Sequence, residues 1–170
     1  LKITTAMKLV SAAKMNRAQQ AILGARPYAA ELDQTIKTIS ALTKDYSHKF
    51  LEENENPRNI LLVISSDRGL CGGYNNQLLK KVRGFIQENG EENFKVFYIG
   101  KKVWELLRKE VNSEKKYEFT KSEPNFDEMR SIANELSHYF STAEVGKVFV
   151  AFNQFKSAIE FIPSVKQVLP

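Results

Sequence analysis

Residues 59–76 read Asn-Ile-Leu-Leu-Val-Ile-Ser-Ser-Asp-Arg-Gly-Leu-Cys-Gly-Gly-Tyr-Asn-Asn. Ile60 to Ile64 is an unbroken aliphatic run between Pro57 and a polar cluster, which is typical of a strand buried on both faces of a parallel sheet. Glycines then permit a tight turn, and apolar residues between Gln77 and Gln87 recur at helical spacing. The stretch therefore predicts a strand-to-helix turn, and such turns often carry the functional residues of α/β domains.

Three interpretations of this turn are open on the residues alone. The first is an elbow of the form Gly-x-nucleophile-x-Gly, with Cys71 as the nucleophile of an α/β thiol hydrolase. It needs a base close to the thiol, yet His48 falls in a polar loop and His138 in an amphipathic helix. The second is a phosphate-binding turn, but the glycine spacing matches neither the dinucleotide fingerprint nor the P-loop. The third, which the residues favour, is a structural turn with Cys71 as a small buried residue.

Composition sets the outer limits. With 170 residues and 42% hydrophobic content, the chain is long enough for one ordinary domain with a real core and an appendage. Its single cysteine excludes an internal disulfide and is compatible with a reducing compartment. The longest apolar run is Ile60 to Ile64, far short of the ~20 residues that span a bilayer.

The net charge of +5 lies entirely at one end of the chain. Residues 31–170 contain equal numbers of basic and acidic side chains, whereas residues 1–30 contain no acid and hold the basic residues Lys2, Lys8, Lys14, Arg17 and Arg26. A basic, acid-free amphipathic segment fits a transit peptide, a nucleic-acid arm, a membrane-surface helix or a shaft that faces an acidic partner. It also fits an ordinary solvated helix face.

A long N-terminal helix is predicted from Ile3 to Leu42. From Ala18 onward its apolar residues recur at alternating steps of four and three, which is the pattern of a coiled-coil seam. The seam keeps its phase across Gly24 and Pro27, so we expect a kink within one continuous apolar face. Such a helix would be about 60 Å long. No later segment is long enough to cover it, so we expect its partner helix to lie outside this chain, and the chain to be a piece of something longer at both ends.

The polar segment from Thr43 to Arg58 is predicted to be a linker, which gives two domains: residues 1–58 with the helix and linker, and residues 59–170 with an α/β domain. Further elements are expected to alternate between strand and helix, which implies a three-layer, Rossmann-like α/β sandwich with a mostly parallel sheet. These are strands at Phe94–Ile99, Tyr117–Thr120, Val148–Phe152 and Ala158–Ile162, helices at Lys101–Lys109 and Phe126–Ser141, and a polar loop around Pro163.

Several segments together resemble a known family. They are Thr5-Ala-Met-Lys-Leu-Val-Ser-Ala-Ala-Lys-Met15, Ala25-Arg-Pro-Tyr28, Ser65-Ser-Asp-Arg-Gly-Leu-Cys-Gly-Gly73, Phe155-Lys-Ser-Ala158 and Pro163-Ser-Val-Lys-Gln-Val-Leu-Pro170. In this order they resemble the gamma subunit, the central rotor shaft of F-type ATP synthases. The resemblance runs the length of the chain and implies a coiled coil of two terminal helices, with an α/β domain as the foot near the membrane ring.

The resemblance implies a non-catalytic subunit without cofactor or metal that transmits torque in proton-driven ATP synthesis. The implied partners are the catalytic and non-catalytic head subunits, an epsilon-type stalk subunit, the membrane ring and the subunit's own C-terminal helix, with no nucleic acid. The complex would lie on the inner face of the bacterial membrane, or on the matrix side of the mitochondrial inner membrane. Expected head contacts are Met7, Lys8, Lys14, Arg17 and Arg68, and Gly69, Cys71, Gly72 and Gly73 would form a structural turn. The paired-cysteine insertion of the chloroplast branch is missing, which argues against redox regulation.

Overall fold

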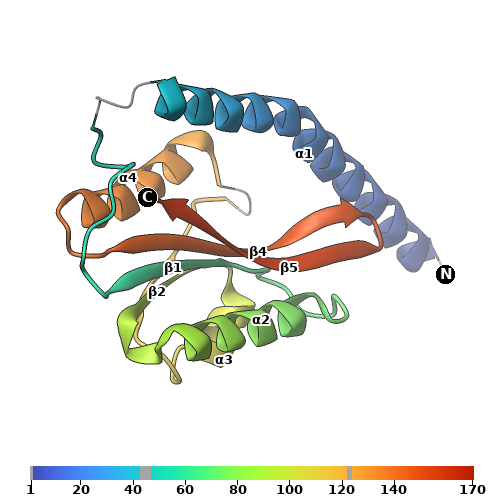
Figure 1. Ribbon diagram of the computed structural model, residues 1–170. Helices are drawn as coiled ribbons and strands as arrows, with labels where there is room; N and C mark the ends of the chain where they lie inside the picture. The colour runs from blue at the N-terminus through green and yellow to red at the C-terminus, as the bar shows by residue number, and fades with distance from the viewer. Residues whose placement is uncertain (1, 43–46, 122–123) are drawn as a thin grey trace. The chain divides into compact units, whose positions relative to one another are not determined.

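The computed structural model describes residues 2–42, 47–121 and 124–170, and the chain divides into two compact units, Leu1–Ser47 and His48–Pro170. The first unit is helix α1, Lys2–Leu42. The second is a five-stranded sheet with helices on both faces (Figure 1). The expected linker Thr43–Arg58 lies partly outside the described residues, and its part from His48 onward belongs to the sheet unit.

Residues 48–58 form a strap on the sheet unit, held by two asparagines. Asn54 donates through Nδ2 to the Val145 carbonyl at 3.0 Å, and Asn56 donates through Nδ2 to the Ala143 carbonyl at 2.8 Å. The Gly146 amide donates to the Arg58 carbonyl at 2.6 Å. The structural boundary therefore lies at Ser47/His48 rather than after Arg58, because polar side chains that look like linker in the sequence fix the backbone instead.

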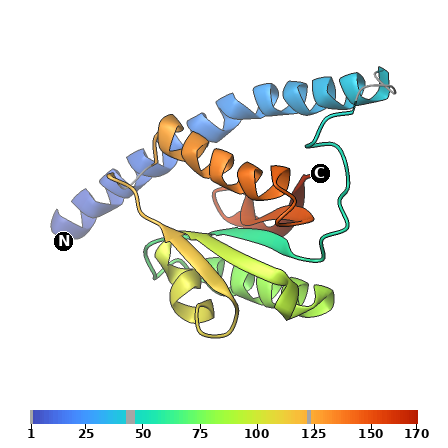
Figure 2. The same ribbon diagram turned by 90° about the vertical axis from the view of Figure 1, so that its left-hand side faces the viewer.

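Helix α1 runs unbroken through Pro27 and buries none of its residues. Its apolar stripe lies open to solvent, including Met7, Val10, Leu32, Ile36 and Ile39. The helix axis is curved rather than straight (Figures 1 and 2). Helices in proteins gain most of their stability by packing an apolar face against another element. The exposed stripe of α1 is a surface on which a partner helix could pack in this way.

The sheet has strand order β3-β2-β1-β4-β5. Strands β1 (Asn59–Ile64), β2 (Phe94–Ile99), β3 (Ser113–Tyr117) and β4 (Lys147–Ser157) are parallel, and β5 (Glu160–Leu169) is antiparallel to β4. Helices α2 (Tyr74–Asn89) and α3 (Lys101–Leu107) cover one face, a short 3-10 helix, Glu91–Asn93, precedes β2, and α4 (Phe126–Ser141) covers the other face (Figures 1 and 2). The prediction of a mostly parallel three-layer α/β sandwich is confirmed.

Two strand predictions were wrong, and both concern edge strands. The third strand was expected at Tyr117–Thr120 but lies at Ser113–Tyr117, because Ser-Glu-Lys-Lys carries no apolar signal on an edge that pairs only with β2. The expected loop around Pro163 lies inside β5, where Pro163 is opposite Asn153. Proline is tolerated there because an edge strand needs hydrogen bonds on one side only.

The domain core has two layers separated by the sheet. Alternate strand residues point to opposite faces, so Leu61 and Val63 pack under α2 and α3, while Ile60 and Leu62 pack under α4. The fully buried aromatic residues are Phe94, Phe97 and Tyr98. Helix α4 begins with a capping box, in which the Asn125 side chain accepts from the Glu128 amide and the Glu128 carboxylate accepts from the Asn125 amide.

Candidate functional site

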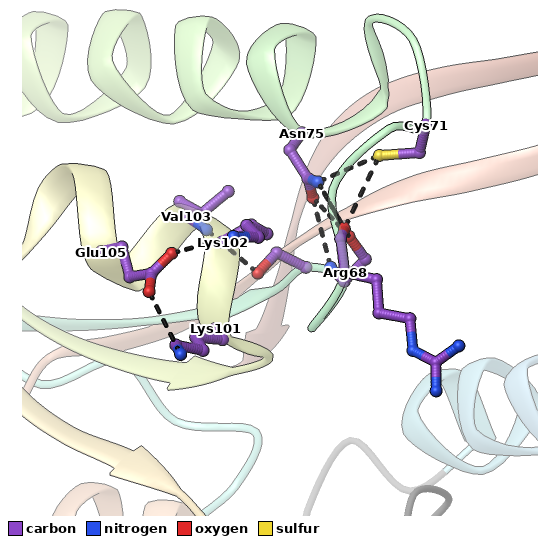
Figure 3. A network of polar contacts seen from close by, with 9 residues as sticks. Arg68, Cys71, Asn75, Lys101, Lys102, Val103 and Glu105 are labelled. Carbon is purple, nitrogen blue, oxygen red and sulfur yellow. Dashed lines mark hydrogen bonds and ion pairs between the residues drawn. The ribbon is translucent and has the colours of Figure 1, made fainter.

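The turn between β1 and α2, residues 65–73, is called the elbow, and one buried amide fixes its shape (Figure 3). Asn75 is 7% exposed; its Oδ1 accepts from the Ser66 amide at 3.2 Å, and its Nδ2 donates to the Ser66 hydroxyl oxygen at 2.8 Å. Its Nδ2 lies 3.5 Å from the Arg68 carbonyl, which also accepts from the Ser66 hydroxyl at 2.7 Å. Asn75 therefore holds the turn from within, as buried polar groups do when they find partners.

Cys71 faces into the elbow with its sulfur (Figure 3). Its Sγ is 3.2 Å from Asn75 Nδ2 and 3.9 Å from the Arg68 carbonyl, and the residue is exposed. The expectation of a small buried cysteine was therefore wrong: the sulfur faces Asn75, but the turn leaves the residue open to solvent. Neither neighbour of the sulfur can act as a base, and His48 is engaged with the Phe50 amide at 3.2 Å. Among the described residues, the hydrogen-bond contacts of the sulfur include no base of the kind that a thiol nucleophile needs.

Among the elbow glycines, the backbone requires glycine most clearly at Gly72, where φ is +59°. A Cβ at Gly69 would make ordinary contact with Lys102, and one at Gly73 would meet only the flexible Gln77 side chain. Gly100, after β2, is more constrained. Its φ is +88°, and a Cβ there would lie 2.0 Å from the Ser65 carbonyl oxygen. The start of the elbow at Ser65 therefore depends on the close approach of Gly100, a residue outside the stretch 59–76.

The carboxyl edge of the sheet is where α/β domains usually bind ligands, and here a cavity of about 740 Å³ opens beside Ser65, Asp67, Lys101 and Lys116. Several polar groups around this cavity form hydrogen bonds or ion pairs within the sheet unit. The Lys102 amide donates to the Ser66 carbonyl at 3.0 Å, Lys101 pairs with Glu105 and Lys116 pairs with Glu118. Hydrogen bonding to Lys102 lowers the pKa of the Glu105 carboxyl (Figure 3).

The base of the elbow is fastened to the β4–β5 hairpin. Asn153 donates through Nδ2 to the Tyr74 carbonyl at 2.9 Å, and the Tyr74 ring meets Phe161 edge-on with centroids 5.1 Å apart. These contacts lie beside β1 and β4, neighbouring strands whose connecting helices α2 and α4 lie on opposite faces of the sheet.

Among residues 2–42, 47–121 and 124–170, no three His, Cys, Asp or Glu side chains gather as a metal site.

The elbow presents four of its side chains to solvent, the first of them Asp67. Arg68 extends away from the network and has no side-chain partner within the described part of the chain (Figure 3). Leu70 is fully exposed and adopts a positive φ of 55°. Cys71 completes the set. Arg68 and Leu70 together could supply a partner with one charged and one apolar contact.

The other residues expected at a partner contact lie along α1. Met7, Lys8, Lys14 and Arg17 are exposed. Over the described ranges, the three cations make no ion pair, unlike Lys37, which pairs with Asp33 further along the helix. Their role in binding stays a prediction.

Sequence analysis missed Ser66, Leu70 and Asn75. Nothing local distinguishes Asn75 from its neighbour Asn76, because its importance comes from facing back into the turn. Leu70 is distinguishable in the sequence, because it is a large apolar residue between Gly69 and Gly72, in a turn too tight to bury it.

No helix within the described residues is long and apolar enough to cross a membrane.

Comparisons with known proteins give a consistent result along the chain. Residues 1–170 match the family model described as ATP synthase. The ATP synthase gamma chain of Geotalea daltonii is 34% identical over 171 residues, which are 99% of this chain and 60% of that protein. That of Anaeromyxobacter dehalogenans strain 2CP-1 is 36% identical over 175 residues, again 99% and 60%.

Solved structures agree with this result. The central stalk/c-ring structure of Tetrahymena thermophila mitochondrial ATP synthase contains a chain that matches with a TM-score of 0.76 and 25% identity, over 99% of this chain and 72% of that one. A chain of the Euglena gracilis mitochondrial enzyme, at 16% identity and a TM-score of 0.50, shares the fold. This chain spans about 60% of the length of the curated relatives. None of these comparisons supports a thiol hydrolase. The chain belongs to the ATP synthase family whose curated members here are named gamma chain.

Proposed function

We propose that this chain forms the lower shaft and foot of the central rotor of an F-type ATP synthase, and that it transmits torque between the membrane ring and the catalytic subunits. The observation that carries the proposal is helix α1, which spans 41 residues and buries none of them. A helix with a heptad stripe is stabilised when a second helix packs against that stripe, and the coiled coil of a central shaft provides such a second helix.

The subunit itself is non-catalytic in this proposal. Support comes from the elbow, where the hydrogen-bond contacts of the cysteine sulfur include no base among the described residues, and from the sheet edge, where Lys101 and Lys116 are engaged by carboxylates of the same domain. ATP synthesis and hydrolysis take place on partner subunits. The chain turns inside them and presents a different side to each in turn.

The partners we propose are the catalytic and non-catalytic subunits of the head, an epsilon-type stalk subunit and the membrane ring. Met7, Lys8, Lys14, Arg17 and Arg68 face the head. The complex lies on the cytoplasmic face of a bacterial membrane, with the matrix side of the mitochondrial inner membrane as the alternative.

Reconstitution tests this function directly. The full-length chain, combined with head subunits purified without their gamma chain, is expected to restore a complex that hydrolyses ATP, and a bead attached to the α/β domain is expected to rotate. Attachment at Glu92, an exposed residue distant in sequence from the elbow, keeps the probe off the proposed contacts. A complex that assembles and hydrolyses ATP without rotating the bead would contradict the proposal.

A further inference from the structure

Two residues other than glycine adopt a positive φ in the part of the chain that the structure describes, Leu70 at 55° and Ala143 at 56°. This backbone region is disfavoured for any side chain because Cβ approaches the following carbonyl oxygen. At Ala143 the local structure explains it. The Ala143 amide donates to the Phe140 carbonyl at 3.0 Å, and the Ala143 carbonyl accepts from Asn56 Nδ2 at 2.8 Å. Both backbone polar groups of Ala143 are therefore hydrogen-bonded in this conformation.

Leu70 has no such explanation. It makes no hydrogen bond among the described residues, and its side chain is 110% exposed relative to a reference leucine. Glycine would adopt this backbone without strain and without placing an isobutyl group in water, and glycines stand at positions 69 and 72. A strained backbone at an exposed site, with no local interaction to account for it, points to a role outside the chain.

The elbow is also built to hold Leu70 in this position. Asn75 and Ser66 fix the carbonyl of Arg68 two residues before it, and Gly72 turns the chain two residues after it. Below them, the Tyr74 carbonyl is bound by Asn153. A side chain presented on a fixed turn loses little conformational freedom on binding, which is the condition for an efficient anchor residue.

The charges beside Leu70 indicate the kind of partner surface that it meets. The elbow exposes two charged residues, Asp67 and Arg68. Asp67 also lines the cavity at the sheet edge, whereas the Arg68 guanidinium extends away from the elbow network and is unpartnered within the described residues (Figure 3). Arg68 is the nearer of the two to Leu70 in the chain, so we take its cation as the charge that accompanies the anchor.

We propose that Leu70 is the apolar anchor by which the elbow docks on a partner protein, in an apolar pocket with a carboxylate at its rim that pairs with Arg68. The inference rests on the proposed rotor function and identifies the head subunits as the carriers of this pocket. It assigns the elbow a two-part contact in which Leu70 supplies burial and Arg68 supplies orientation.

The test compares stability with binding in the full-length chain. Leu70→Gly and Leu70→Asn both relieve the backbone strain, so the melting temperature of the free chain is expected to equal or exceed that of the wild type. Their dissociation constants for immobilised head subunits are expected to rise by about tenfold to a hundredfold, the effect of losing one buried leucine. Leu70→Met keeps an apolar side chain and is expected to retain most of the affinity.

Ala143→Gly is the matched control, because it relieves the same φ at a turn that the proposal does not use. It is expected to leave affinity unchanged. Wild-type binding together with unchanged binding of Leu70→Gly would overturn the anchor alone, and so would a fall in melting temperature that accounts for the lost binding. Failure of the wild-type chain to bind the head would overturn the rotor function as well.

Discussion

Apolar and basic side chains are arranged in opposite ways in the two units of this chain. In the sheet unit the aliphatic and aromatic residues are buried in two layers, and many cations pair with carboxylates of the same unit, as Arg83 does with Glu110 and Lys115 with Glu135. In α1 the apolar stripe is exposed, and Lys8, Lys14 and Arg17 pair with nothing in the described chain. The sheet unit satisfies its own groups, whereas the helix carries groups that another surface must satisfy.

The largest expected difference between the two units is in the hydrogen-exchange rates of their backbone amides. Amides of β1 are expected to exchange only through global unfolding, which for a domain of this size costs about 5–15 kcal/mol. Amides of α1 are expected to exchange orders of magnitude faster, because the helix lacks a packed face. Mass spectrometry of the chain at a concentration where it is monomeric measures both. Equal protection of α1 and β1 would show that the helix does not depend on a partner.

Truncation of one apolar residue in each unit gives the next largest effect. Phe97 is 0% exposed and stacks on Tyr117, so Phe97→Ala is expected to cost about 3–5 kcal/mol in unfolding free energy. Ile36 is 49% exposed, and Ile36→Ala is expected to change the free energy by less than about 0.5 kcal/mol. Urea unfolding followed by Trp104 fluorescence checks both. A large cost at Ile36 would mean that the α1 stripe is already packed.

The strap sharpens the boundary between the units. Asn56→Ala removes the hydrogen bond to the Ala143 carbonyl and the one accepted from the Arg58 amide, and is expected to destabilise the sheet unit by about 1–3 kcal/mol. Asn16→Ala, an exposed position on α1, is the matched control, with an expected change below about 0.5 kcal/mol. Both are measured by urea unfolding. If Asn56→Ala behaved like Asn16→Ala, residues 48–58 would be a linker as the sequence predicts.

The same contrast explains what the sequence could predict. Strands β1 and β2 were found almost to the residue because burial on both faces leaves a continuous apolar run. The third strand and β5 were misplaced because they are sheet edges, where polar residues and Pro163 are allowed. At the elbow, the turn was predictable from its glycines. The inward-facing Asn75 was not, since its partners Ser66 and Arg68 become neighbours only when the turn closes.

The smallest effect on stability is expected from the basic residues of α1, and for that reason they give the most specific test of the proposed role. Lys8, Lys14 and Arg17 are exposed and unpaired over the described ranges, so their joint replacement by glutamine should change the unfolding free energy of the sheet unit by less than about 0.5 kcal/mol. Against an acidic partner, each exposed pair contributes only about 0–1 kcal/mol. Contacts this weak can be broken and remade at each rotational step, whereas a few strong ones would trap the shaft at one angle.

The triple variant is therefore expected to fold normally but to couple less well in the reconstituted complex, as the ratio of ATP-driven proton pumping to ATP hydrolysis. Because exposed charges are screened over about 10 Å at 0.1 M salt, raising the salt concentration should lower the wild-type ratio toward that of the variant. Lys37→Gln is the control, since Lys37 already pairs with Asp33 at 2.6 Å and has little charge to offer a partner. If the triple variant and the wild type give the same ratio at every salt concentration, the charge on α1 is only a solvated surface.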